Sequence, residues 1–250
     1  MSHHIVQAED LHYTYPDGKV ALQGLSFLIT HGESVAIIGA NGAGKSTLLM
    51  HLNGVILPQK GMVRIGEMPV TRETLPNIRR TVGTVFQDSD DQLFMPTVFD
   101  DVAFGPLNLG FPKEEVEKKV RETLEKVGAL HLINRATHRL SGGEKRSVAI
   151  ATVLAMAPDI LVMDEPTSNL DPKSRRNLIE LLKSFTHTKI IATHDLDMAM
   201  DLCTRTIVLS EGKIIADGPT SDILINEQLL HKSYLEKPLS LQGCPICNKK

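Results

Sequence analysis

Short apolar runs alternate with amphipathic stretches along most of the chain. Four apolar runs have the length and composition of strands buried on both faces of a sheet. They occupy residues 34–38, 160–163, 189–193 and 205–209. The amphipathic stretches have helical spacing and occupy residues 113–127, 142–157, 173–185 and 196–202. Strands that alternate with helices predict an α/β fold with a mostly parallel sheet, covered by helices on both faces.

The N-terminal region has a different periodicity. Residues 5–30 alternate apolar and polar side chains around the turn Pro16-Asp17-Gly18, which predicts antiparallel strands. Residues 62–65 could continue that sheet. We therefore expect an antiparallel β subdomain beside the parallel core.

Two further stretches lack the strand–helix rhythm. Residues 82–110 begin as a strand and continue as a loop-rich segment, which is broken up by Pro96, Pro106 and Pro112. From about residue 226 the rhythm is lost again, and the chain ends in a polar, basic tail.

The segment after the first apolar run matches a phosphate-binding loop at every fixed position. It reads Gly39-Ala40-Asn41-Gly42-Ala43-Gly44-Lys45-Ser46 and is followed by a predicted helix over 47–52. Glycines let backbone N–H groups turn toward a polyphosphate, and the helix N-terminus adds a favourable dipole. Lys45 would then reach the β- and γ-phosphates, and the Ser46 hydroxyl would bind Mg²⁺. A chance match would occur in roughly one percent of chains this long, and the strand–loop–helix context favours a nucleotide site.

Polar side chains follow other predicted strands. Asp164 and Glu165 come directly after the run at 160–163, at the edge where open α/β sheets bind ligands. Asp164 is placed to hold Mg²⁺, directly or through a water, and Glu165 to polarise an attacking water. Taken alone, the pair could equally cap a helix. His194 ends the next strand and could contact the γ-phosphate, although a lone histidine there is usually structural. Gln87 ends a further strand and by itself says little.

A serine and two glycines open the predicted helix at residue 142. In Leu140-Ser141-Gly142-Gly143-Glu144, free backbone N–H groups at the helix start would point outward. The alternative is a plain capping box, because Ser141 and Glu144 have its spacing. The order of all these motifs along the chain favours a nucleotide-binding role over the plain cap.

Composition narrows the function classes. The chain is 42% hydrophobic and 23% charged, as in ordinary soluble domains, and its net charge of −3 argues against general nucleic-acid binding. No apolar run approaches the ~18 residues of a membrane span, and no signal-peptide pattern is present. The three cysteines do not suggest a disulfide framework, which agrees with a nucleotide enzyme of the reducing cytosol. Any role at a membrane would therefore require a partner.

The ordered motifs resemble those of the ATP-binding subunits of ABC transporters, from about residue 5 to 218. The resemblance implies a phosphate-loop ATPase fold with a RecA-like, mostly parallel core, an antiparallel β subdomain and a helical signature subdomain. It implies an ATPase domain over 1–225, with the helical part at about 88–157, and a C-terminal extension over 226–250.

The same resemblance implies a head-to-tail dimer, homodimeric or paralogous, that encloses two ATP molecules. The LSGGQ-type segment with Ser141, Gly142 and Gly143 would complete the ATP site of the opposite subunit. In the subunit's own site, the resemblance adds further candidates. Nucleotide contacts are expected from Tyr15, Gly39, Asn41, Gly42, Gly44, Lys45, Ser46 and Thr47, catalysis from Lys45, Gln87, Glu165 and His194, and Mg²⁺ ligands from Ser46, Gln87 and Asp164.

Some positions depart from the family pattern or leave a choice open. Tyr15 matches the aromatic residue that stacks on adenine, with Tyr13 as its competitor, and Asp171 matches a loop that couples the two sites. Glu144 stands where Gln is commoner. Ser147 replaces a frequent Arg, Arg146 stands one place earlier, and Asn169 replaces Ala. No catalytic group is lost, but the local dimer contacts stay open.

Residues 85–106 are similar to the corresponding stretch of energy-coupling-factor ATPases, which power cobalt, nickel and vitamin uptake. In that subfamily the region forms a groove for helices of a membrane subunit. Leu93, Phe94, Met95 and Phe104 would supply apolar surface here, or would simply pack the helical lobe. The resemblance implies transmembrane energy-coupling and substrate-binding partners, no nucleic acid, and a peripheral position on the cytoplasmic face of the cell membrane.

Cobalt or nickel is the preferred cargo, with vitamin uptake as the alternative. Cys244 and Cys247 have half the spacing of a metal knuckle, although a mobile tail without a site is the simpler interpretation. Two further classes stay open, a soluble ABC ATPase outside transport and a regulatory module without turnover. The first usually has two fused ATP modules or a long coiled coil, and the intact catalytic set argues against the second.

Overall fold

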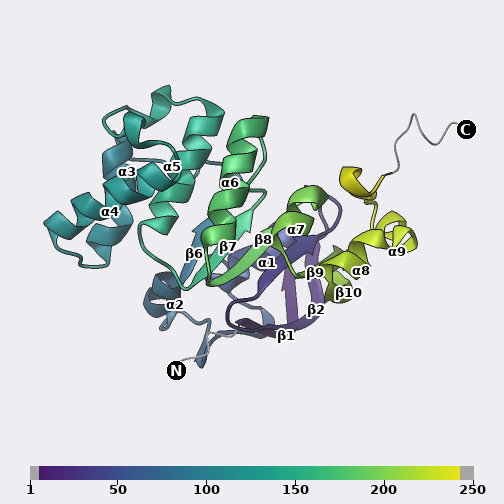
Figure 1. The fold of residues 1–250 in the computed structure, drawn as a ribbon. Helices are drawn as coiled ribbons and strands as arrows, with labels where there is room; N and C mark the ends of the chain where they lie inside the picture. Colours follow the sequence, from purple (N-terminus) through teal and green to yellow (C-terminus); the bar gives the residue numbers. More distant parts are fainter. Residues whose placement is uncertain (1–5, 243–250) are drawn as a thin grey trace, which may run out of the picture.

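The computed structural model describes residues 6–242, and two sheets organise them (Figure 1). The larger sheet has the strand order β10-β9-β3-β8-β7-β6, with β10 antiparallel to β9 and the other neighbours parallel. Its strands are β3 (Ser34–Ile38), β6 (Val82–Val85), β7 (Ile160–Asp164), β8 (Thr188–Ala192), β9 (Arg205–Ser210) and β10 (Lys213–Pro219). Every residue of β3, β7 and β8 is buried, which confirms the predicted parallel core.

The smaller sheet is antiparallel and has the order β2-β1-β4-β5. Its strands are β1 (Val6–Thr14), β2 (Val20–Ile29), β4 (Lys60–Ile65) and β5 (Met68–Pro69). Helix α1 (Lys45–Leu52) packs in one apolar core with residues of both sheets, and its Leu48 and Leu52 are fully buried. The predicted N-terminal antiparallel strands, and their continuation at 62–65, are confirmed.

A second core lies on the opposite face of the large sheet. Residues of β3, β7 and β8 pack there against α6 and α7 and against the C-terminal helices. These helices are α6 (Pro172–Ser184), α7 (Leu196–Leu202), α8 (Thr220–Ile225) and α9 (Glu227–Lys232), followed by the 3-10 turn η3 (Leu239–Leu241). The fully buried Leu230 joins α9 to this core. The described part of the C-terminal extension is therefore folded onto the domain.

A helical lobe stands to one side of the sheets and has its own core (Figure 1). It contains α3 (Val98–Asn108), α4 (Lys113–Lys126), α5 (Gly142–Leu154) and the turns η1 (Leu130–Leu132) and η2 (Thr137–Arg139), while α2 (Leu75–Thr81) packs near β6. The expectation of a loop-rich segment up to residue 110 was wrong, because α3 occupies much of it. The misleading signals were the prolines. Pro106 is tolerated near the end of α3, and Pro112 stands at the N-cap of α4.

Helix α5 ends a turn earlier than its pattern predicts. Ala157, just before Pro158, has a positive φ of 51°, which stops helical geometry. No helix within residues 6–242 has the length and apolar character needed to cross a bilayer. The proposed limits of the ATPase domain and extension stay predictions.

Candidate functional site

The phosphate-loop motif joins the end of β3 to α1 and has a backbone that only glycine supports at two points. Gly39 has a φ of +154°, and a Cβ atom there would lie 2.2 Å from the Leu209 carbonyl oxygen. Gly44 has a φ of +105°, and its Cβ would lie 2.7 Å from the Ala21 carbonyl oxygen. A side chain at either position would displace backbone of the neighbouring strands, so both glycines are required by the loop's shape.

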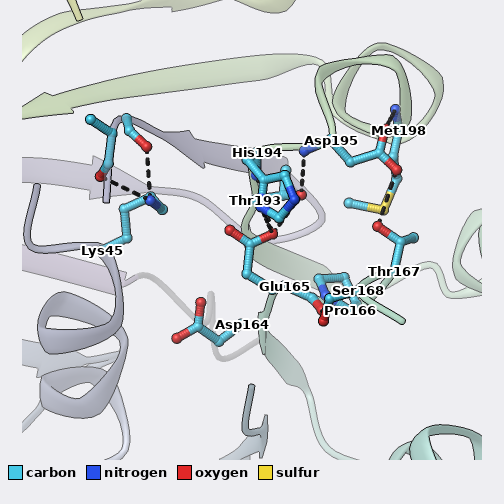
Figure 2. A network of polar contacts seen from close by, with 12 residues as sticks. Lys45, Asp164, Glu165, Pro166, Thr167, Ser168, Thr193, His194, Asp195 and Met198 are labelled. Carbon is cyan, nitrogen blue, oxygen red and sulfur yellow. Dashed lines mark hydrogen bonds and ion pairs between the residues drawn. The ribbon is translucent and has the colours of Figure 1, made fainter. Parts of the chain in front are cut away.

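Lys45 lies folded across this loop. Its Nζ donates hydrogen bonds to the carbonyl oxygens of Gly39 at 2.8 Å and Ala40 at 3.2 Å (Figure 2). The side chain is buried. An ammonium group held only by two neutral carbonyls has no anionic partner in these contacts, so a phosphate would compete well for it.

The loop opens into a cavity of about 840 Å³. It gathers the predicted residues of the subunit's own site, which are Tyr15, Gly39, Asn41, Gly42, Gly44, Lys45, Ser46, Thr47, Gln87, Asp164, Glu165 and His194. The structure thus brings together side chains from five separate parts of the sequence. The volume is within the range of small-molecule sites.

Tyr15, and not Tyr13, lines this cavity. The hydroxyl groups of Tyr15 and Thr47 are hydrogen-bonded at 2.9 Å. Tyr13 packs behind Tyr15, edge to face at 5.0 Å between ring centroids, and also contacts the His51 ring. Of the two tyrosines, Tyr15 is therefore the one that faces the cavity, and its contact with adenine stays a prediction.

Glu165 lies at the end of β7 with its carboxylate directed toward the end of β8 (Figure 2). Its Oε2 accepts hydrogen bonds from the His194 backbone N–H at 3.2 Å and from the Thr193 hydroxyl at 3.3 Å, and lies 2.8 Å from His194 Nδ1 as an ion pair. The Glu165 side chain is buried, whereas His194 is 68% exposed to the cavity side. This pairing orients the carboxylate and leaves the imidazole accessible to a ligand.

Asp164 lies next to Glu165 and has a buried oxygen, Oδ1, without a hydrogen-bond partner. Burial raises the pKa of Asp164, and the hydroxyl of Ser46 acts in the opposite direction. A carboxylate, a hydroxyl and the nearby Gln87 amide are the oxygen donors that Mg²⁺ prefers. The orphaned oxygen and this donor set therefore fit a magnesium ion.

Ser141, Gly142 and Gly143 lie outside the nucleotide cavity of their own chain. The predicted capping box is present: Ser141 Oγ accepts from the Glu144 N–H at 3.4 Å, and Glu144 Oε2 accepts from the Ser141 N–H at 2.7 Å. The cap explains Ser141 and Glu144, but it gives no reason for two successive glycines.

Some expected residues take other local roles, or lie beyond the described chain. Asp171 is the N-cap of α6, where its carboxylate accepts from the N–H groups of Lys173 and Ser174. Cys244 and Cys247 lie outside the described residues. Within 6–242, no group of three or more His, Cys, Asp or Glu side chains is arranged to hold a metal ion, and the proposed magnesium donors include only one such residue, Asp164.

Sequence reasoning missed two features of the site. Tyr234 and Leu235, which follow α9, line the nucleotide cavity, and no local motif marks them. Arg146 is buried and contacts the backbone of Asp164 and Glu165. A signal for Arg146 did exist, because it shares the buried face of α5 with Ile150 and Val153 at helical spacing.

Comparison with known proteins gives the family. Residues 22–168 match the profile of the family described as ABC transporter. The chain belongs to this family. As an ABC ATPase it hydrolyses ATP, and its two sheets and helical lobe are those of the ABC-type fold, as predicted.

Two curated relatives of this ABC ATPase align over nearly its whole length. An ABC transporter ATP-binding protein of Geobacter sulfurreducens is 66% identical, with 100% of both chains covered. The energy-coupling factor transporter ATP-binding protein EcfA of Methanocaldococcus jannaschii is 45% identical and covers 99% of this chain and 90% of its own. The resemblance to energy-coupling ATPases is thereby confirmed.

Two solved structures share the fold. CbiO1 of Clostridium perfringens, described as part of the ABC transporter complex CbiONQ, is 39% identical with a TM-score of 0.79, covering 92% of this chain and 94% of its own. A dimeric ATP-binding cassette in a post-hydrolysis state, bound to ADP and phosphate, is 30% identical with a TM-score of 0.80. The alignment covers 86% of this chain and 98% of that chain.

Proposed function

We propose that this ABC ATPase powers an energy-coupling-factor importer, that it works as a dimer with a second copy or a paralogue, and that its cargo is cobalt or nickel. The main support for the dimer is the open space around Gly142 and Gly143, the two glycines of the signature segment. A Cβ atom added at Gly142 would meet no heavy atom within 4 Å, and one added at Gly143 would have its nearest neighbour 3.9 Å away. Neither glycine has a positive φ.

The chain's own fold therefore does not require glycine at either position. A close approach from outside the subunit, for which a Cβ atom would leave no room, would account for glycine at both positions. Gly142 is also exposed at the start of α5, with backbone N–H groups free to meet an anion. A partner's ATP γ-phosphate fits this requirement.

The site residues, together with Mg²⁺ and the α5 N-terminus of a partner, would account for hydrolysis. Lys45 would exchange the Gly39 and Ala40 carbonyls for phosphate oxygens. Glu165, oriented by His194, would accept a proton from the attacking water, while the exposed imidazole contacts the γ-phosphate. Mg²⁺, held by Ser46, Asp164 and Gln87, would neutralise phosphate charge. The N-terminus of the partner's α5 would close the far side of the pocket.

The surface for a membrane subunit is proposed on the helical lobe. Phe94 and Phe104 are 63% and 42% exposed, and their rings pack edge to face at 4.9 Å between centroids. Leu107 is exposed on the same helix as Phe104. Such a paired aromatic surface suits an apolar helix of a transmembrane partner. The ATPase would then sit peripherally on the cytoplasmic face of the membrane, with no nucleic acid as partner.

Reconstitution tests the importer. The chain is co-expressed with its membrane partners, purified as a complex and assayed in vesicles for ATP-dependent uptake of cobalt, nickel and vitamins. We expect uptake of cobalt or nickel, and its loss with Phe94→Ser and Phe104→Ser combined, while the isolated ATPase keeps its turnover. Uptake of a vitamin alone would contradict the cargo. Failure to associate with any membrane subunit would contradict the importer itself.

A further inference from the structure

Arg146 is the only charged side chain among the buried residues of α5. A guanidinium group carries five N–H donors, and here each has a backbone carbonyl as acceptor. Nε donates to Pro166 at 3.1 Å, Nη1 to Phe86 at 2.5 Å and Gln87 at 3.2 Å, and Nη2 to Asp164 at 2.7 Å and Glu165 at 2.5 Å. A buried cation with every donor matched has one available geometry.

Three of these acceptors are consecutive along the chain and surround a strained backbone. Residues 164–166 include Glu165, whose φ of +45° is uncommon for a residue with a side chain. The guanidinium binds the carbonyl oxygens on both sides of this kink. Arg146 therefore holds the backbone that aims the Glu165 carboxylate.

The other two acceptors lie on the segment that follows β6. They belong to Phe86 and Gln87, and Gln87 lines the nucleotide cavity. The same segment is tied to α5 again through Gln92, whose Nε2 donates to the Ala149 carbonyl at 2.6 Å and to the Thr152 hydroxyl at 2.8 Å. The Gln87 segment and α5 are thus joined at successive turns of one helix.

We propose that Arg146 is a positioning residue that couples the nucleotide site of its own subunit to the signature segment it presents to the partner. This inference rests on the proposed dimeric ATP site. Arg146 lies about one and a half turns from Ser141 on the same helix. A shift of Gln87 or Glu165 on nucleotide binding therefore moves the start of α5 directly, because no flexible segment intervenes. The arginine at 146 is on the inner face of α5, where its guanidinium reaches these carbonyls. An arginine at the next position, which Ser147 occupies, would lie about 100° further around the helix.

Hydrogen exchange on the monomeric chain tests the coupling apart from dimerisation. At concentrations shown by light scattering to be monomeric, the protein is saturated with the β,γ-imido analogue of ATP and Mg²⁺, and amide exchange is followed by mass spectrometry. In the parent we expect nucleotide to slow exchange in the phosphate loop and to change it in residues 141–146. In Arg146→Gln and Arg146→Lys, the phosphate loop stays protected and the change at 141–146 is lost.

The matched control is Arg121→Met, which removes an arginine from an exposed i,i+4 pair with Glu117 on α4. It should behave as the parent. Persistence of the 141–146 response in both Arg146 variants would overturn the proposal, as would its absence in a parent whose phosphate loop is protected. No protection of the phosphate loop in the parent would instead refute the nucleotide site.

Steady-state kinetics provides a second readout that a general loss of stability would not give. We expect Arg146→Lys to lower kcat about tenfold or more while the Kd for ATP changes less than about threefold. Lysine keeps the charge but lacks the planar fork, so the loss reports geometry. A kcat within about twofold of the parent would contradict the positioning role. The thermal midpoint of each variant shows whether it is folded at the assay temperature. If Arg146→Lys is not, kcat is measured on the uncharged variant Arg146→Gln instead.

Discussion

Glu165 combines a left-handed backbone with a buried carboxylate, and Asp164 beside it has an oxygen without a partner. Each feature costs free energy on the order of 1–3 kcal/mol. Both lie on one wall of the cavity that also holds Lys45. Local conflicts of this kind are expected where a ligand supplies the missing contacts. At the residue scale, the nucleotide site therefore has buried groups whose interactions within the chain are incomplete.

Gly39 and Gly142 allow two requirements to be tested apart, because the fold requires the first and the proposed ligand contact requires the second. Gly39→Ala places a Cβ against the Leu209 carbonyl oxygen, so we expect the free energy of unfolding to fall by about 2 kcal/mol or more. Gly142→Ala meets open space and should keep stability or raise it by up to about 1 kcal/mol, yet lower ATP hydrolysis about tenfold. Denaturant unfolding and phosphate release measure both. Unchanged hydrolysis in stably folded Gly142→Ala would contradict its contact with a partner's nucleotide.

His51 gives the fold a dependence on pH. Its Nδ1 donates to the Thr47 carbonyl at 2.7 Å, while Nε2 is buried without a partner and the ring packs on Tyr13. Burial lowers the pKa of His51, because the site disfavours the charged imidazolium. The stabilisation by neutral His51 is therefore fully present above the unfolded pKa, near 6.5, and is lost as the pH falls toward the folded pKa.

We accordingly expect the parent to lose more unfolding free energy than His51→Gln between pH 7 and pH 5, as measured by denaturant titration at each pH. The exposed His138→Gln is the matched control and should follow the parent. Equal losses in the parent and in His51→Gln would show that this imidazole does not contribute.

At the scale of elements, periodicity predicted most strands and helices because their burial patterns are local. Helix α3 was missed because Pro106 reads as a break in the sequence, whereas it lies in the last turn of the helix. The motif residues of the site were found for the same local reason, since Lys45 and Ser46 belong to one contiguous motif that runs from Gly39 into the start of α1. The backbone contacts of Arg146 and the cavity position of Tyr234 were not found, because their partners are far away in the sequence and become neighbours only through the fold.

Tyr234 connects the C-terminal extension to the nucleotide cavity. Its φ is +55°, its side chain is 81% exposed, and it lines the cavity with Leu235. We expect Tyr234→Ala to raise the Kd for ATP about two- to tenfold, the range of one lost aromatic contact, without lowering the thermal midpoint. Equilibrium binding with the β,γ-imido analogue measures this. Leu239→Ala, exposed and outside the cavity lining, is the control. An unchanged Kd would exclude Tyr234 from the binding site.

At the scale of the whole molecule, the parts of the ATP machinery are divided between two surfaces. The nucleotide cavity holds Lys45, Asp164, Glu165 and His194, whereas Ser141 lines a different hollow at the start of α5. Gly142 borders a third hollow, which it shares with Ser46, Gln87 and Asp164, so the signature segment lies near its own magnesium side but outside the cavity that holds Lys45. The sequence suggested this division only through a family resemblance, because no local pattern reveals which surface a second molecule covers.

The mass of the Glu165→Gln variant in solution tests this division most directly. Glutamine keeps the shape of Glu165 but cannot accept the proton, so ATP should bind and persist. By sedimentation with saturating ATP and Mg²⁺, we expect a dimer that reverts to monomer when ATP is removed, and a monomer throughout when Gly142→Asp is added. A Glu165→Gln variant that binds ATP yet stays monomeric at all concentrations tested would contradict an ATP site shared between two copies of this chain.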